Sequence, residues 1–240
     1  MREIAGTVPE LTDRKEEELR SGSGPIFNTP PIVLSVIGVL IAIHLALQLA
    51  GQDWQIWSIY AFAFIPSRFG GGESIAMIEG SQYWSLITYA FLHDGWMHVL
   101  VNSVWLLIFG TPVARQFGTL RFLLIALIST IGGALVMLAV YWGSSVPAVG
   151  ASAAVSGLLA AAIPVMYGRR GAPLSFHEFF HNRGAIIFML VVLGLTLLSG
   201  VQSLPGFADN ARIAWEAHLG GFFAGLAAYF TMMREGVRGA

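Results

Sequence analysis

The sequence predicts an all-α membrane protein, and three observations carry this prediction. Hydrophobic residues make up 55% of the 240 residues and charged residues only 11%, whereas ordinary soluble domains carry about 25% charged residues. The apolar residues gather in runs of about 20 residues, the length that crosses a bilayer core. The 28 glycines favour close packing between membrane helices. We therefore expect a polytopic bundle with six transmembrane helices.

Composition also excludes several classes of protein. The net charge of −1 argues against nucleic acid as a partner. The absence of cysteine excludes disulfides, thiol catalysis and cysteine-ligated metals. Residues 1–28 are polar and lack the apolar core of a signal peptide. We expect a cytoplasmic tail over 1–28, a membrane domain over 29–233 and a short cytoplasmic tail over 234–240.

The first span is predicted over Pro31 to Ala50. His44 and Gln48 lie one turn apart in it, and we interpret them as a polar stripe satisfied by neighbouring helices. The following stretch, Gly51 to Gln82, is too polar and too broken by proline and glycine to span. It is rich in tryptophan, tyrosine and phenylalanine, which favour the membrane interface. We expect a long, partly helical interfacial loop in or on the outer leaflet.

Five further spans follow this loop. Thr111 to Leu120 is predicted as a short turn and Gly168 to Arg183 as a polar loop. The spans are predicted within Tyr83 to Gly110 (starting near Asp94 and Gly95) and over Phe122 to Trp142, Val149 to Tyr167, Ala185 to Leu204 and Ile213 to Met233.

The distribution of cations gives the orientation. Six spans place both termini on one side, and of the 13 lysines and arginines all except Arg68 and Arg212 fall on that side. The positive-inside rule then places both termini in the cytoplasm. We expect a multi-pass protein of the bacterial inner (plasma) membrane, with a site that opens to the outer face.

Polar residues that are costly in lipid stand near the starts of three spans. Ser152 opens the fourth span, His98 and Asn102 lie in the second, and His218 lies in the sixth. These spans all run inward from the outer face, so the side chains share a shallow depth. Small residues around Ser152 and the Gly-x-x-x-Gly that follows His218 let the two backbones approach. A tight helix pair whose serine and histidine bond only to backbone remains an alternative.

The residue types predict acyl transfer. Ser152 is the candidate nucleophile and His218 its general base. Glu216 is two residues before His218 and so points to the opposite face, which leaves a dyad rather than a triad. His98 and Asn102 are i and i+4 on one face. With the Ser152 backbone N–H, near the positive end of its helix, they can form an oxyanion hole.

These motifs resemble those of the rhomboid intramembrane serine proteases. The resemblance covers roughly Tyr83 to Met232, together with the first helix and the broad loop. It rests on Gly150-Ala151-Ser152, on Ala217-His218-x-x-Gly221, and on His98-x-x-x-Asn102 preceded by His93.

The resemblance implies a rhomboid-like six-helix bundle that cleaves transmembrane proteins near the outer ends of their helices. It implies no metal and no organic cofactor. Ser152 matches the family's nucleophile and His218 its base. His98, Asn102 and His93 match its oxyanion and water-retention positions, and Gly150 belongs to its serine motif.

Three positions depart from the family pattern. Ala153 stands where the serine motif usually ends in glycine. Ser156 stands where some members carry an aromatic ring that packs on the base. Ser85, after Trp84, stands where the family often has arginine, so the interfacial loop must be fixed in another way.

Two other functions are weighed against the protease. His177-Glu178-x-x-His181 matches a zinc signature, but no third ligand is evident nearby and an interfacial amphipathic segment is the preferred interpretation. A membrane chaperone or adaptor that binds helices without cutting them would be indicated by loss of Ser152 or His218, and both are present. The sequence specifies neither the physiological substrate nor the oligomeric state. The fifth span and the turn at Pro205 to Asn210 are the candidates for a lateral gate.

Overall fold

The computed structural model describes residues 29–70, 78–169, 172–201 and 215–238. The predicted tail over 1–28, the Pro205 to Asn210 turn and Arg212 lie outside the described residues. Helices dominate the described part, as the composition predicts. They are α2 (Pro31–Ala50), α3 (Gln52–Phe62), η1 (Pro66–Phe69), α4 (Ser81–Thr88), η2 (Tyr89–Phe91), α5 (Trp96–Trp105), η3 (Leu106–Gly110), α6 (Thr111–Val140), α7 (Ser152–Met166), α8 (Phe176–His181), α9 (Arg183–Val201) and α10 (Trp215–Arg238).

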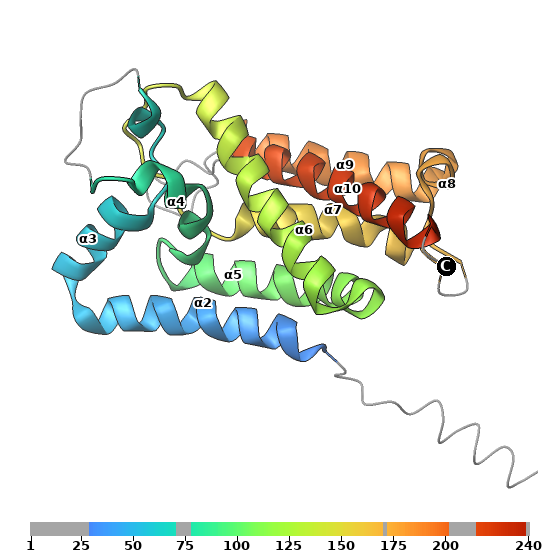
Figure 1. Ribbon diagram of the computed structural model, residues 1–240, viewed down its shortest axis with the longest axis horizontal. Coiled ribbons are helices and arrows are strands. Elements are labelled where there is room, and N and C mark those ends of the chain that lie inside the picture. The colour runs from blue at the N-terminus through green and yellow to red at the C-terminus, as the bar shows by residue number, and fades with distance from the viewer. Residues whose placement is uncertain (1–28, 71–77, 170–171, 202–214, 239–240) are drawn as a thin grey trace, which may run out of the picture.

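The centre of the fold is formed by α6, α7 and α10, which pack more extensively against one another than any other helices do. Ten of the fifteen residues of α7 are buried. Helix α6 crosses the bundle obliquely beside α7 and α10 (Figure 1). Small residues dominate α7, which lets its neighbours on both sides approach closely.

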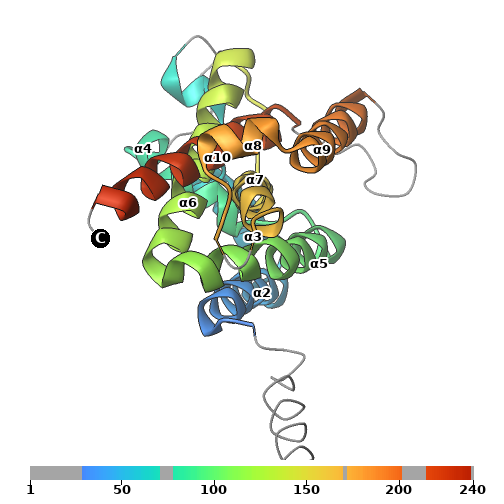
Figure 2. The same cartoon turned by 90° about the vertical axis from the view of Figure 1, so that its right-hand side faces the viewer.

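Two outer layers flank this centre. Helices α2 and α5 pack side by side on one side of α7, and α9 stands at the opposite edge (Figure 2). Both outer layers expose large apolar side chains, among them Leu34 and Leu49 on α2 and Ile187 and Leu195 on α9. Such exposure suits a surface that faces lipid rather than water.

Two described helices are long and apolar enough to cross a membrane. One is α2, with 20 residues. The other is the continuous helical run Trp96–Val140, with 45 residues. At 1.5 Å per residue that run would measure about 68 Å if straight, more than twice the ~30 Å hydrocarbon core. The chain instead reverses direction between α5 and the long part of α6 (Figure 1).

The reversal differs in detail from the predicted turn at Thr111 to Leu120. Helix α6 begins at Thr111, directly after the π-helical η3, and continues past Leu120. The interruption is concentrated at Gly118, which has a φ of 75° and a ψ of 178°. Glycine adopts a positive φ at little cost, so a single residue redirects the helix and a turn of ten residues is not required.

The interfacial loop is fixed by side chains that bond to its backbone. Arg68, 6% exposed, donates to the carbonyls of Ala63 (2.8 Å) and Tyr60 (2.5 Å). Trp84 on α4 donates to the Ala61 carbonyl at 2.7 Å. The guanidinium that holds the loop is therefore that of Arg68, which belongs to the loop itself. The loop is fixed although position 85 carries serine and not arginine.

The same loop is paired with the segment before α7. Phe64 and Ala148 form an antiparallel bridge, with N–H to carbonyl distances of 3.1 Å and 2.8 Å. The Gly150 N–H donates to the Tyr89 carbonyl at 3.0 Å. These bonds tie the start of α7 to the loop and to η2.

Candidate active site

The first turn of α7 lies directly against the imidazole of His98. Gly150 has a φ of 119°, and a Cβ there would stand 2.6 Å from His98 Nε2 and 2.7 Å from its Cε1. Only a residue without a side chain allows this approach. The structure thus brings His98, from α5, to the backbone two residues before Ser152.

The hydrogen bonds of His98 determine which nitrogen faces this space. The Asp94 N–H donates to His98 Nδ1 at 3.4 Å. Because Nδ1 is then an acceptor, the proton of the neutral ring resides on Nε2. That N–H is directed to the Gly150 side and is available to an anionic oxygen beside Ser152.

Asn102 lies one turn further along α5 and is 4% exposed. Its Nδ2 donates to the His98 carbonyl at 3.2 Å, and the same nitrogen would be 3.8 Å from a Cβ at Gly150. An amide nitrogen carries two protons, so one N–H remains beside that bond. The predicted pairing of His98 and Asn102 on one face of α5 agrees with this arrangement.

His93 binds the start of α7 as an acceptor. Its Nε2 accepts the Ala151 N–H at 3.4 Å, and its ring meets that of His98 edge-on, with centroids 5.0 Å apart. Helix N-termini leave backbone N–H groups without partners. His93 therefore caps α7. Because its Nε2 is an acceptor, this nitrogen carries no proton to donate to an oxygen beside Ser152.

Helices α7 and α10 meet backbone to backbone. A Cβ on Gly221 would stand 2.2 Å from the Ala153 carbonyl oxygen, and one on Gly225 would stand 2.4 Å from Gly157 Cα. Ser152 precedes Ala153, and His218 is one turn before Gly221. The predicted close contact of these two helices through small residues is present.

Ser152 and His218 lie at this crossing and are both half-buried. His218 is within electrostatic range of His98, which places the imidazoles of α5 and α10 around the start of α7. Within the described residues, the serine hydroxyl and the His218 ring are not hydrogen-bonded to each other. Catalytic hydrogen bonds are often long without substrate and shorten in the reacting complex.

The methyl group of Ala153 fits because α6 leaves room for it. A Cβ on Gly133 would stand 2.6 Å from the Ala153 Cβ and 2.8 Å from the Ala217 carbonyl oxygen. Ala153 is 1% exposed. The extra carbon at this family position is therefore matched by the absence of one at Gly133.

Ser156 is half-buried one turn below Ser152. Among the described residues, no aromatic ring pairs with the His218 imidazole. The base is thus placed by the contacts of α10 with α6 and α7.

Glu216 is a buried carboxylate that sequence reasoning did not place. It is 3% exposed, and its Oε1 accepts a hydrogen bond from the Tyr141 hydroxyl. This contact joins the start of α10 to the residue that follows α6. The carboxylate is engaged with Tyr141 and not with His218, so it does not complete a triad.

The zinc-like motif lies in α8. Glu178 accepts from the Ser175 N–H (2.9 Å) and hydroxyl (2.6 Å) in a capping box, and these bonds lower the pKa of Glu178. His181 Nδ1 bonds to the His177 carbonyl at 2.8 Å, and the two rings stack at 4.1 Å. No set of three histidine, aspartate or glutamate side chains suited to a metal occurs among the described residues. The motif therefore caps and packs a short helix.

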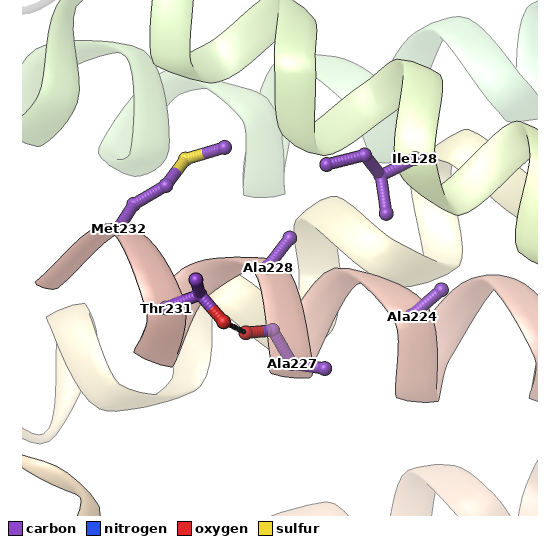
Figure 3. A pocket seen from close by; sticks show the side chains of 6 residues that line it. All are labelled: Ile128, Ala224, Ala227, Ala228, Thr231 and Met232. Atoms are coloured by element: carbon purple, nitrogen blue, oxygen red, sulfur yellow. Dashed lines mark hydrogen bonds between the residues drawn. The ribbon is translucent and has the colours of Figure 1, made fainter. Parts of the chain in front are cut away.

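A cavity of about 420 Å³ lies between α6 and α10, away from these residues. The Thr231 hydroxyl in its wall is already bonded to the Ala227 carbonyl at 2.8 Å (Figure 3). The cavity offers no titratable group for chemistry. Its lining residues are Ile128, Ala224, Ala227, Ala228, Thr231 and Met232.

Comparison with known proteins identifies similar chains. Residues 80–235, more than half of the chain, match the model of the Rhomboid domain. The chain is 31% identical over 164 residues to RHOMBOID-like protein 4 of Arabidopsis thaliana, covering 68% of this chain and 38% of that protein.

Two bacterial proteins named as rhomboid proteases are also similar. GluP of Bacillus subtilis is 28% identical over 215 residues, covering 89% of this chain and 38% of GluP. GlpG of Yersinia pseudotuberculosis is 25% identical over 222 residues, covering 92% of this chain and 68% of GlpG. The chain thus spans about two fifths of the length of RHOMBOID-like protein 4 and of GluP.

Proposed function

This chain belongs to the rhomboid family, and we propose that it is an intramembrane serine endopeptidase. Membership of that family implies an integral membrane protein, and proteases are among the relatives. In the proposed reaction, Ser152 attacks a peptide carbonyl of a transmembrane-helix substrate near its outer end. The observation that carries the proposal is the His98 ring lying on Gly150, at the start of the helix that Ser152 opens.

The reaction proceeds by acyl transfer. The Ser152 hydroxyl oxygen bonds to the carbonyl carbon as its proton passes to His218, the general base. The tetrahedral intermediate collapses, and the leaving amine takes that proton from His218. Water, deprotonated by the same imidazole, then releases the acyl group and regenerates the Ser152 hydroxyl.

The oxyanion is stabilised by donors that are already oriented. The proposed donors are His98 Nε2–H, the second N–H of Asn102 and the Ser152 backbone N–H, with the first two beside Gly150. The last of these lies at the positive end of α7. Donors held in place before the reaction stabilise the transition state without reorganisation.

The substrate enters sideways from the bilayer. Helix α9 is the proposed moving element, because it stands at the edge of the bundle and exposes large apolar side chains such as Ile187, Leu190 and Leu195. Its contacts with α7 and α10 are sparse compared with those among α6, α7 and α10. A loosely packed helix opens at lower cost than a central one.

Six spans with both termini in the cytoplasm of a bacterial inner membrane complete the proposal. The cation distribution supports this orientation. The chain has no cysteine, so single cysteines can report on it directly. Ser145→Cys and Ala172→Cys, both at exposed positions, should be labelled by an impermeant maleimide from opposite sides of the membrane. Labelling of both from one side would contradict the topology.

The decisive experiment compares Ser152→Ala with Ser156→Ala, its neighbour one turn along α7. We expect Ser152→Ala to lower cleavage of a helix-bearing reporter by at least about 10⁴-fold, and Ser156→Ala to keep most of it. His218→Ala should behave as Ser152→Ala does. Cleavage that survives Ser152→Ala would rule out the dyad.

The second candidate function is a chaperone or adaptor that binds transmembrane helices without cutting them. The presence of both Ser152 and His218 favours the protease. A wild-type protein that binds the reporter helix but never cleaves it, under conditions where another rhomboid protease does, would favour the adaptor.

A further inference from the structure

Glu216, in the first turn of α10, is a buried carboxylate that the proposed mechanism does not use. Its side chain is 3% exposed, and its Oε2 has no hydrogen-bond partner among the described residues. The helix dipole favours an acidic residue in a first turn, but a solvated carboxylate would supply that effect as well. Burying the carboxylate costs free energy that burying a leucine would not. Packing and the helix dipole therefore do not explain a glutamate at this position.

The carboxylate is held by a tyrosine whose backbone is itself fixed. Glu216 Oε1 accepts a hydrogen bond from the Tyr141 hydroxyl. The Tyr141 N–H donates to the Met137 carbonyl at 2.8 Å, and the Tyr141 carbonyl accepts the Ser144 N–H at 2.9 Å. Tyr141 directly follows α6. The bond therefore fastens the first turn of α10 to the end of α6.

The next turn of α10 is held by contacts between backbones. A Cβ on Gly220 would stand 2.5 Å from the Gly132 carbonyl oxygen of α6, and one on Gly221 would stand 2.2 Å from the Ala153 carbonyl oxygen of α7. Such contacts set how closely the helices approach. Glycine offers no side chain to interlock with a neighbour, so these contacts give little resistance to rotation of α10 about its own axis. The hydrogen bond at the first turn adds that resistance.

Rotation of α10 matters because Glu216 and His218 lie on opposite faces of the helix. Successive residues of an α-helix are about 100° apart, so the two positions differ by about 200°. A rotation that carries Glu216 away from Tyr141 moves His218 by a similar amount in the opposite direction. His218 is three residues before Gly221, at the crossing with α7. The same movement therefore changes its approach to Ser152.

We propose that Glu216 is a positioning residue, which through its bond to Tyr141 fixes the rotation of α10 and so aligns the His218 imidazole with Ser152. The carboxylate acts on the helix and not on the His218 ring, so it is not the third member of a triad. Loss of the bond leaves the backbone contacts of α10 in place, and the protein stays folded. The inference rests on the proposed proteolytic function, because alignment matters only if His218 takes the serine proton.

The first test compares Glu216→Leu with Glu216→Gln. Leucine removes the acceptor, whereas glutamine keeps a carbonyl oxygen on a side chain of the same length. We expect Glu216→Leu to lower kcat about tenfold at unchanged KM, because a small displacement of a catalytic group slows the chemical step. Glu216→Gln should stay within about threefold of wild-type kcat, because the Tyr141 hydroxyl can still donate to it. Equal kcat in the two variants would overturn the positioning role.

A double-mutant cycle tests whether the effect passes through Tyr141. Tyr141→Phe alone should lower kcat about as much as Glu216→Leu does, and Glu216→Leu/Tyr141→Phe should be no slower than either. Replacing both partners of a buried hydrogen bond by apolar groups is nearly neutral for stability. The double variant should therefore melt in detergent at the wild-type temperature although its turnover is slow. Additive losses of kcat would overturn the proposal, because the two side chains would then act independently.

Tyr229→Phe is the matched control. The Tyr229 hydroxyl also holds α10, by a hydrogen bond to the Leu174 carbonyl at 2.8 Å. It lies eleven residues after His218, about 16 Å along the helix. We expect this variant to lose stability and to keep wild-type kcat. Equal kcat in Tyr141→Phe and Tyr229→Phe would overturn the positioning role, and this comparison decides even if Glu216→Leu does not fold.

The outcomes distinguish the two proposals. If cleavage by the wild-type protein does not depend on Ser152 and His218, the proposed function fails. If cleavage depends on both residues but Glu216→Leu and Tyr141→Phe keep wild-type kcat, only the positioning role of Glu216 is overturned.

Discussion

The two sides of the candidate site are built in different ways. On the α10 side, backbones touch: Gly221 meets the Ala153 carbonyl and Gly225 meets Gly157. On the α5 side, His98 is oriented by a hydrogen bond from the Asp94 N–H. At the start of α7, the Ala151 N–H donates to the His93 ring.

The difference predicts two kinds of sensitivity. A backbone contact has no room for an added atom, because interiors are close-packed. A hydrogen-bonded ring tolerates changes of volume nearby but not the loss of a donor or an acceptor. The α10 side should therefore fail through unfolding, and the α5 side through lost turnover in a folded protein.

The largest effect is expected from Gly225→Ala. Its Cβ would stand 2.4 Å from Gly157 Cα and 2.5 Å from Gly157 O. We expect the free energy of unfolding in detergent to fall by about 3 kcal/mol. The control is Gly194→Ala on α9, which meets nothing within 4 Å and should change stability by less than about 1 kcal/mol, in the stabilising direction. Equal melting temperatures for the two variants would refute the close contact.

His98→Ala and Asn102→Ala should each lower kcat about 100-fold, equivalent to about 2.7 kcal/mol, since one oxyanion donor is lost. Circular dichroism should show that the fold is kept. Ser103→Ala is the control, because the Ser103 hydroxyl bonds to Val99 within its own helix at 2.7 Å. If both site variants turn over as fast as wild type, the two residues are structural polar groups.

Arg68→Leu tests how the interfacial loop is held. It removes two bonds from a cation to backbone carbonyls, and we expect a local loss of about 2 kcal/mol. Hydrogen exchange of residues 60–69 should report it. Trp84→Phe removes one neutral bond to Ala61 and should cost about 1 kcal/mol. Unchanged exchange in both variants would show that the bridge between Phe64 and Ala148 holds the loop alone.

The smallest effect is expected at α8. The double variant His177→Ala/His181→Ala should keep wild-type cleavage, because these rings stack on each other and Glu178 caps its own helix. A chelator such as EDTA should leave the rate unchanged as well. Loss of activity in either experiment would revive the zinc interpretation.

Hydrophobic periodicity and length predicted much of the fold. The first span was predicted at Pro31 to Ala50, the bounds that α2 has. The end of the second span was harder to predict. The helix continues through Thr111–Phe117, and a single glycine at 118 makes the change of direction. A turn of ten residues was therefore too long.

Parts of the site could also be predicted, where spacing on one helix decides the geometry. His98 and Asn102 are such a pair. The contact of Glu216 with Tyr141 could not be predicted, because it depends on which helices become neighbours. In a bundle the far face of a helix meets another helix, so Glu216 is buried even though it points away from the His218 face.

The order of the elements along the chain has a consequence for biosynthesis. Ser152 lies at the start of α7, whereas His218 lies in α10, the last helix described. During translation, Ser152 leaves the ribosome well before His218 does. A chain still being inserted therefore carries the proposed nucleophile without its base, and the proposed activity arises only once α10 has docked against α7. The newly made protein would thus stay inert beside other nascent membrane proteins until its own α10 has been inserted.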